Sequence, residues 1–244
     1  MKAFCIKRSI VTTGLVGCLL AILVAQATAS SVVYDGSSGN LSASVTFSLT
    51  GNTLTVDLTN TSLSDVTVPA DVLTAVFFNS THLLSPVSAA ASGSTAYYGS
   101  TSNVGDGWGY YVNLAGGGHG FNNAITAVGF GIGSGHSSFS NHSNSLGGIN
   151  YGLLSAGDNP LTGNNGVKGK GPLFKDSVQF TFTVGNGFKL SELGDDVVFQ
   201  YGSSLLEPHY VGKLEPAPVP EPSSLLLVGS GVLGLGTLLR RIMS

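Results

Sequence analysis

Cysteine and arginine are missing from most of the chain. The two cysteines, Cys5 and Cys18, lie near the N-terminus, and the arginines are confined to positions 8, 240 and 241. Residues 30–218 therefore contain neither residue type. Without cysteine, this segment cannot form disulfides, a cysteine-ligated zinc site or a thiol nucleophile.

Positive charge is scarce in the same segment. Residues 30–218 hold five lysines and twelve acidic residues, a formal charge of −7. A nucleic-acid-binding surface needs concentrated basic side chains to displace counterions from phosphates. We therefore expect no nucleic-acid partner, and an anionic lipid surface is a poor partner for the same reason.

The first 29 residues have the order of a secretory signal peptide. Three basic residues within the first nine are followed by an apolar stretch over 10–25 and then by Ala27-Thr28-Ala29. This order predicts export through the Sec translocon with cleavage after Ala29 or after Ala27. Two alternatives stay open: a lipoprotein cleavage box ending at Cys18, beyond which the chain remains apolar, and an uncleaved anchor helix.

The C-terminal segment combines a spacer with a short apolar run. Four prolines lie within residues 215–222 and favour an extended conformation. The apolar run 223–239 is 17 residues long, about 25 Å as a helix, which is the short limit for a transmembrane span. Arg240 and Arg241 follow in the basic tail 240–244, and they predict a cytoplasmic end.

The sequence Val219-Pro220-Glu221-Pro222, followed by the span and the arginine pair, closely resembles the PEP-CTERM sorting signal of bacterial exosortase substrates. The resemblance implies that a membrane-embedded exosortase recognises Pro220, Glu221 and Pro222 and removes the span. The protein would then pass from a transient inner-membrane anchor to the cell surface or matrix of a Gram-negative bacterium that makes polysaccharide. Permanent anchoring is the alternative.

Residues 30–215 are predicted to be one all-β ectodomain between the signal peptide (1–29) and the spacer with its sorting signal (216–244). Apolar and polar residues alternate over 45–49 and 54–58, with a turn at Gly51-Asn52. A two-residue hairpin there places six apolar side chains on one face. The predicted pairs are Leu49 with Leu54, Phe47 with Val56, and Val45 with Leu58.

Further strands are expected along the rest of the segment. The apolar run 72–78 is typical of a strand buried on both faces. The other candidates are 97–98, 108–114, 124–132, 178–184 and 197–201, the last as the final strand, with one helical turn at 191–193. Many short strands predict a β-sandwich, jelly-roll-like or Ig-like, and the 20 glycines of 99–171 predict long loops or partial disorder.

Three fragments, at 69–79, 150–158 and 199–208, resemble an uncharacterised group of ectodomains found ahead of PEP-CTERM tails. That resemblance implies no activity and no catalytic residues.

Catalytic and metal motifs are not evident. The histidines at 82, 119, 136, 142 and 209 lack the spacings of transition-metal sites, and G-x-S-x-G is absent from the ectodomain. We expect no enzyme, no catalytic residue and no metal site. Open alternatives are a hydrolase with two carboxylates, for which Asp195-Asp196 is the only adjacent pair, and Ca²⁺ held by Asp158-Asn159 with Asn164-Asn165.

Aromatic residues give the one binding hypothesis. Trp108 and Tyr110 alternate onto one face of a strand, opposite Tyr111, and could stack on sugar rings or complete the core. The leading hypothesis is a structural or adhesive protein of the biofilm or envelope. The alternative is a carbohydrate-binding module that attaches to exopolysaccharide.

Overall fold

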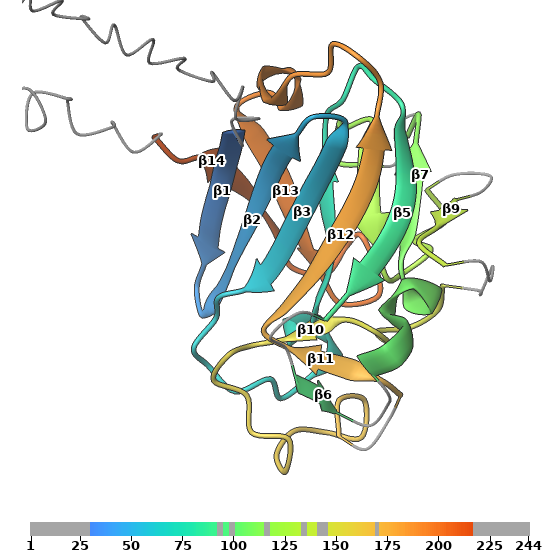
Figure 1. Ribbon diagram of the computed structural model, residues 1–244. Helices are drawn as coiled ribbons and strands as arrows, with labels where there is room; N and C mark the ends of the chain where they lie inside the picture. Colours follow the sequence, from blue (N-terminus) through green and yellow to red (C-terminus); the bar gives the residue numbers. More distant parts are fainter. Residues whose placement is uncertain are drawn as a thin grey trace, which may run out of the picture.

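The computed structural model describes residues 30–91, 95–97, 101–114, 118–132, 136–140, 146–168 and 171–216 (Figure 1). The strands of this part are β1 Ser30–Ser38, β2 Leu41–Thr50, β3 Thr53–Asn60, β4 Leu73–Phe78, β5 Leu84–Ala90, β6 Thr95–Tyr97, β7 Gly109–Val112, β8 Asn123–Thr126, β9 Ser137–Ser138, β10 Leu153–Leu154, β11 Leu173–Lys175, β12 Ser177–Val184, β13 Asp196–Tyr201 and β14 His209–Leu214. The short 3-10 helices are η1 Pro69–Asp71, η2 Thr101–Gly107 and η3 Leu190–Leu193.

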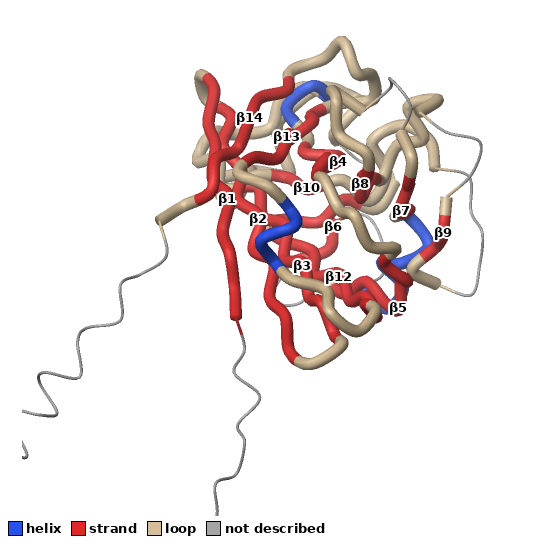
Figure 2. The backbone as a smooth tube through the Cα atoms, turned by 90° about the horizontal axis from the view of Figure 1, so that it is seen from above, coloured by secondary structure: helices blue, strands red, loops and turns tan. Residues whose placement is uncertain are grey.

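Most strands form two layers that belong to one nearly closed sheet, and β10, β11 and β6 continue this sheet from β4 at one end (Figure 1). The order β5-β12-β3-β2-β1 makes the front layer, and β14-β13-β4, extended by β8, β7 and β9, makes the back layer (Figure 1). β1 joins the layers, because it pairs with β2 along its whole length and with β14 at Tyr34 and Asp35. On the other side β5 lies against η2 and β9, and Figure 2 shows the strands surrounding a common interior.

The all-β prediction is confirmed, whereas the choice between a jelly-roll-like and an Ig-like sandwich stays a prediction. The β2–β3 hairpin has the predicted register: Val45 faces Leu58, Phe47 faces Val56 and Leu49 faces Leu54. Gly51 opens the turn with a φ of 58°, a conformation that costs glycine little.

The apolar run around β4 is buried on both faces, as predicted. All six residues of β4 are buried. Phe78 faces the interior and packs against Phe47 with ring centroids 5.3 Å apart. Phe77 faces outward, where it belongs to a second apolar cluster with Tyr111 and Val198. The loops of the back layer therefore cover the side of β4 that a simple sandwich would expose.

Other strand boundaries were predicted less well. The strand expected at 197–201 is not the last, because β14 follows it and pairs with β13. The strand expected over 124–132 ends at Thr126. The helical turn expected at 191–193 is present as η3. Within the glycine-rich region 99–171, the described residues contain four short strands, β7 to β10, and η2.

Both predicted targeting segments lie outside the described residues. These are the signal peptide with Ala27 and Ala29, and the sorting signal with Pro220, Glu221, Pro222, Arg240 and Arg241. Among the residues that the structure describes, no helix has the length and apolar character to cross a membrane.

Candidate functional site

Trp108 and Tyr110, the predicted sugar-stacking pair, lie in the core. They are 1% and 2% exposed. The Trp108 ring packs edge-on against Phe180 with centroids 5.0 Å apart, and Tyr110 packs against Phe182 at 5.1 Å. Tyr111 points to the opposite face of β7, as the alternation predicted, but it is also buried. The stacking prediction is therefore wrong for these rings, and the core alternative is confirmed.

A polar pocket of about 200 Å³ lies near the Tyr110 hydroxyl, at the end of the molecule that carries η3. We call it the His82 pocket. Three segments supply its lining, the β4–β5 turn, the end of β7 and the start of β8. The lining residues are Ser80, Thr81, His82, Leu83, Val112, Asn113, Asn122 and Asn123.

Hydrogen bonds hold the floor of the His82 pocket in place. The Tyr110 hydroxyl donates to Asn123 Oδ1 at 2.7 Å, and Asn123 Nδ2 contacts Asn122 Oδ1. Asn122 Oδ1 accepts from the backbone N–H of Ser80 at 3.0 Å, and Asn122 Nδ2 donates to the Ser80 carbonyl at 3.0 Å. The two asparagine side chains are therefore fixed by the strands beneath them.

An imidazole–carboxylate pair stands at the rim. His82 Nδ1 lies 2.6 Å from Glu192 Oε2, and the Thr81 hydroxyl donates to the same oxygen at 2.5 Å. The Thr81 hydrogen bond, followed by that of His82, lowers the pKa of Glu192, so the carboxylate stays ionised and can only accept. Nδ1 must therefore carry a proton, and Nε2 is the ring nitrogen left to bond elsewhere. Nε2 has no partner among the described residues.

In the loop predicted to offer calcium ligands, two side-chain oxygens accept hydrogen bonds from backbone N–H groups of the protein. Asp158 Oδ1 accepts from the Val66 N–H at 3.0 Å, and Asn159 Oδ1 accepts from the Leu161 N–H at 3.1 Å. Burial raises the pKa of Asp158, whereas a hydrogen bond from Thr162 lowers the pKa of its neighbour Asp65. In the described part of the chain, no three His, Cys, Asp or Glu side chains group as metal ligands.

Two further histidines meet on the back layer. The rings of His119 and His209 stack with centroids 4.2 Å apart, and His119 Nε2 lies 2.8 Å from Gln200 Oε1. His142 lies outside the described residues, and His136 packs beside Tyr111. None of these contacts was predicted, because the partners are far apart in sequence.

Of the adjacent acids Asp195 and Asp196, the second forms an ion pair with a lysine. Asp196 pairs with Lys213 at 3.3 Å on an exposed surface. The pair therefore offers no support for a hydrolase.

The outer face of the front layer is dominated by hydroxyl groups. In the four cross-strand rows that join β2, β3 and β12, ten of the twelve outward positions are Ser or Thr, and the other two are Asp57 and Gln179. We call this surface the hydroxyl face. Cross-strand register aligns it into rows: Thr50, Thr53 and Thr183; Ser48, Thr55 and Thr181; Thr46, Asp57 and Gln179; Ser44, Thr59 and Ser177.

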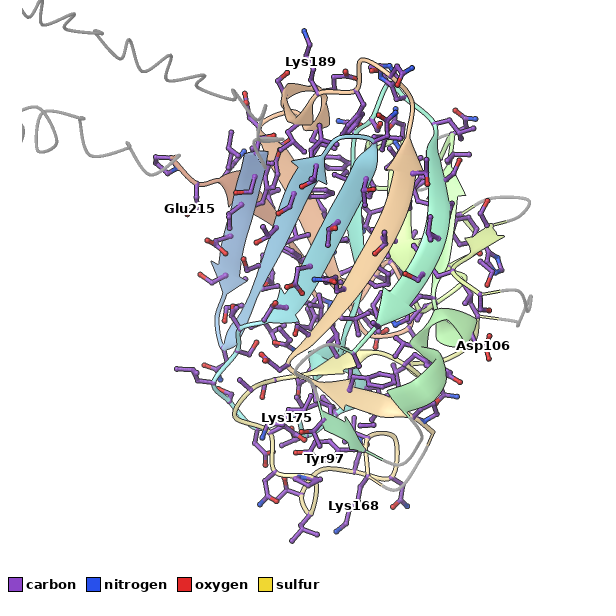
Figure 3. The ribbon with its side chains drawn as sticks, in the orientation of Figure 1. Tyr97, Asp106, Lys168, Lys175, Lys189 and Glu215 are labelled. Carbon is purple, nitrogen blue, oxygen red and sulfur yellow. The ribbon has the colours of Figure 1, made fainter. Side chains whose placement is uncertain are left out.

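Three lysines lie away from the hydroxyl face, at the two ends of the molecule. Figure 3 shows Lys189 at one end of the molecule and Lys168 and Lys175 at the other. Burial raises the pKa of Asp57, the acidic residue of the face, with a smaller contribution from Asp176. The face is therefore a broad surface of hydroxyl groups with one acidic side chain, Asp57.

Comparison with known proteins identifies the C-terminal segment. The family model of the PEP-CTERM protein-sorting motif matches residues 218–241. The chain carries a PEP-CTERM sorting signal. This motif supports exosortase-dependent sorting of an exported cell-surface protein, with exosortase as the processing partner. No curated protein and no solved structure matches the chain.

Proposed function

We propose that the domain is a non-enzymatic structural or adhesive component of the biofilm or envelope. The hydroxyl face carries this proposal. Ten short hydroxyl side chains in register give the domain a wide surface, with Asp57 as its acidic residue, that can exchange hydrogen bonds with a hydrated matrix. Of the two alternatives left open for Trp108 and Tyr110, the structure has the rings in the core.

The proposed route to the surface uses both ends of the chain. The leader directs Sec-dependent export and is cleaved after Ala29 or Ala27. Residues 223–239 then hold the protein in the inner membrane of a Gram-negative bacterium, with Arg240 and Arg241 in the cytoplasm. Exosortase cleaves near Pro220-Glu221-Pro222. The match to the PEP-CTERM motif supports the last step most directly.

The mass and location of the protein in its native host test this route. With exosortase present, we expect a product that ends near residues 220–222 and is found outside the inner membrane. Without exosortase, or with Glu221→Ala, the product should retain Arg240-Arg241 and stay in the membrane. A full-length membrane product in every strain would contradict the route. Biofilm cohesion after deletion of the whole chain tests the adhesive role separately.

Attachment to exopolysaccharide is the second candidate function. Trp108 and Tyr110 no longer support it, because neither ring reaches the surface. The His82 pocket favours it instead. The pocket combines a fixed imidazole, asparagine side chains and exposed aliphatic side chains within about 200 Å³.

A further inference from the structure

We propose that the His82 pocket binds one neutral sugar residue of a polysaccharide. This inference rests on the attachment function and gives it a place in the fold. The site lies at the end of the sandwich, between the β4–β5 turn and the ends of β7 and β8.

The free hydrogen-bonding groups of the pocket suit sugar hydroxyls. His82 Nδ1 donates to Glu192, which leaves Nε2 as the ring nitrogen that can bond a sugar hydroxyl. The Asn113 side chain can donate and accept, and it has no hydrogen-bond partner among the described residues. A sugar hydroxyl both donates and accepts, so one sugar residue can satisfy both side chains.

Apolar side chains line the same pocket. Leu83 is 71% exposed and Val112 is 36% exposed. The C–H face of a sugar ring can cover such aliphatic groups and remove their surface from water. Because the Asn122 and Asn123 side chains are already held by hydrogen bonds, the floor loses little freedom when a ligand binds.

Charge selects a neutral sugar over an acidic one. No lysine or arginine lines the pocket, and the ionised Glu192 carboxylate contacts His82 directly. A uronic acid would place its carboxylate near this charge without a cation to compensate for it, which disfavours binding. The volume of about 200 Å³ is below the range of drug-sized sites, so it suits a single sugar unit.

Saturation-transfer NMR on the full chain in detergent micelles tests the proposal. The probes are glucose, galactose, N-acetylglucosamine and glucuronate. We expect at least one neutral sugar to bind with a dissociation constant of about 1 mM, and glucuronate to bind at least about 10-fold more weakly. Asn113→Gly and His82→Ala should each weaken binding of the neutral sugar about 10-fold.

The controls separate the pocket from general effects. Asn113 has a φ of 54°, which glycine adopts readily, so Asn113→Gly removes the amide without straining the backbone. Asn40→Gly is the matched control, because Asn40 lines a separate pocket at the opposite end of β2 and should bind sugar as the wild type does. Glu192→Gln tests the positioning role of the carboxylate. A glutamine amide can donate to Nδ1, which moves the imidazole proton to Nε2 and should lower affinity without unfolding the protein.

Three results would overturn the proposal: no binding of any neutral sugar, tighter binding of glucuronate, or unchanged binding by both Asn113→Gly and His82→Ala. Failure of the attachment function is a separate result, in which the wild-type chain does not sediment with the exopolysaccharide of its host. Failure of the pocket alone leaves that sedimentation in place, and Asn113→Gly and His82→Ala then sediment as the wild type does.

Discussion

The hydroxyl of Tyr110 donates a hydrogen bond of 2.7 Å to the side-chain oxygen of Asn123. The Tyr110 ring belongs to the aromatic core, and Asn123 belongs to the floor of the His82 pocket. A residue that the sequence suggested as a sugar platform thus fills the interior with its ring and supports a polar pocket with its oxygen. The bond connects the core to the proposed site.

Tyr110→Phe should destabilise the fold by about 1–3 kcal/mol, because it leaves the Asn123 oxygen, in a side chain 3% exposed, without its donor. Tyr111→Phe is the matched control on the opposite face of the same strand. The Tyr111 hydroxyl has no hydrogen-bond partner among the described residues, so its loss should change stability by less than about 0.5 kcal/mol. Urea unfolding of both variants measures the difference, and equal losses would contradict the assigned role.

The local sequence pattern was sufficient to predict strand pairing where strands that are adjacent in the sequence are also adjacent in the sheet. The β2–β3 register follows from alternation and a two-residue turn, so the pairing of Phe47 with Val56 was predictable. The strand β14 was not predicted. Its burial alternates from His209 to Lys213, but the residue types do not, because Gly212 is buried and Val211 is exposed. Its place is set by pairing with the distant β1 and β13.

The sequence left the environment of Trp108 open. The neighbouring glycines are compatible with an exposed surface, but in the structure they mark close packing. A Cβ on Gly107 would lie 1.8 Å from the Tyr151 ring, and one on Gly109 would lie 2.6 Å from His136. The sequence cannot distinguish a glycine that allows an unusual backbone conformation from one that allows close packing of a side chain. In these two cases the packed side chain lies over 25 residues away in the sequence.

The His82 pocket could not be predicted for a similar reason. Its lining comes from three segments, and Glu192 lies 110 residues beyond His82. No short motif links these positions. Only the antiparallel pairing of β8 with β4 and β7 brings the segments together.

The single tryptophan makes the burial of Trp108 directly measurable. Because Trp108 is 1% exposed and packs on Phe180, its fluorescence should be blue-shifted and resist quenching by iodide. Unfolding in urea should shift the emission to the red and restore quenching. Strong quenching in the native state would show that the indole is accessible to solvent. It would contradict the burial of Trp108 and support stacking of this ring on a sugar.

Asp158 and Asp65 should respond to mutation in opposite directions at neutral pH. Burial raises the pKa of Asp158 above 3.8, so the folded state binds its proton more tightly, and this contribution to stability is lost as pH rises through the folded pKa. The pKa of Asp65 is lowered, so its contribution is present above 3.8 and is lost on acidification. At pH 7, Asp158→Asn should raise and Asp65→Asn should lower the thermal midpoint.

The thermal midpoint also tests whether the loop that contains Asp158 binds calcium. If Ca²⁺ raises the thermal midpoint of the wild type but not that of Asp158→Asn, the loop binds calcium and the carboxylate is a ligand. The hydrogen bond that Asp158 accepts from the Val66 N–H leads us to expect no such shift.

The stack of His119 on His209 should make stability sensitive to mild acid. Burial lowers the pKa of His119, and the neighbouring His209 adds to the effect, although the Gln200 hydrogen bond opposes it. The unfolded chain therefore binds the proton more readily, and stability falls as pH drops below about 6.5. Titration of the His119 imidazole by NMR should give a pKa below the ordinary value, and His209→Gln should raise it. A wild-type pKa at or above 6.5 would contradict this account, because a ring that charges as readily in the fold as in water is not held by burial between Phe77 and His209.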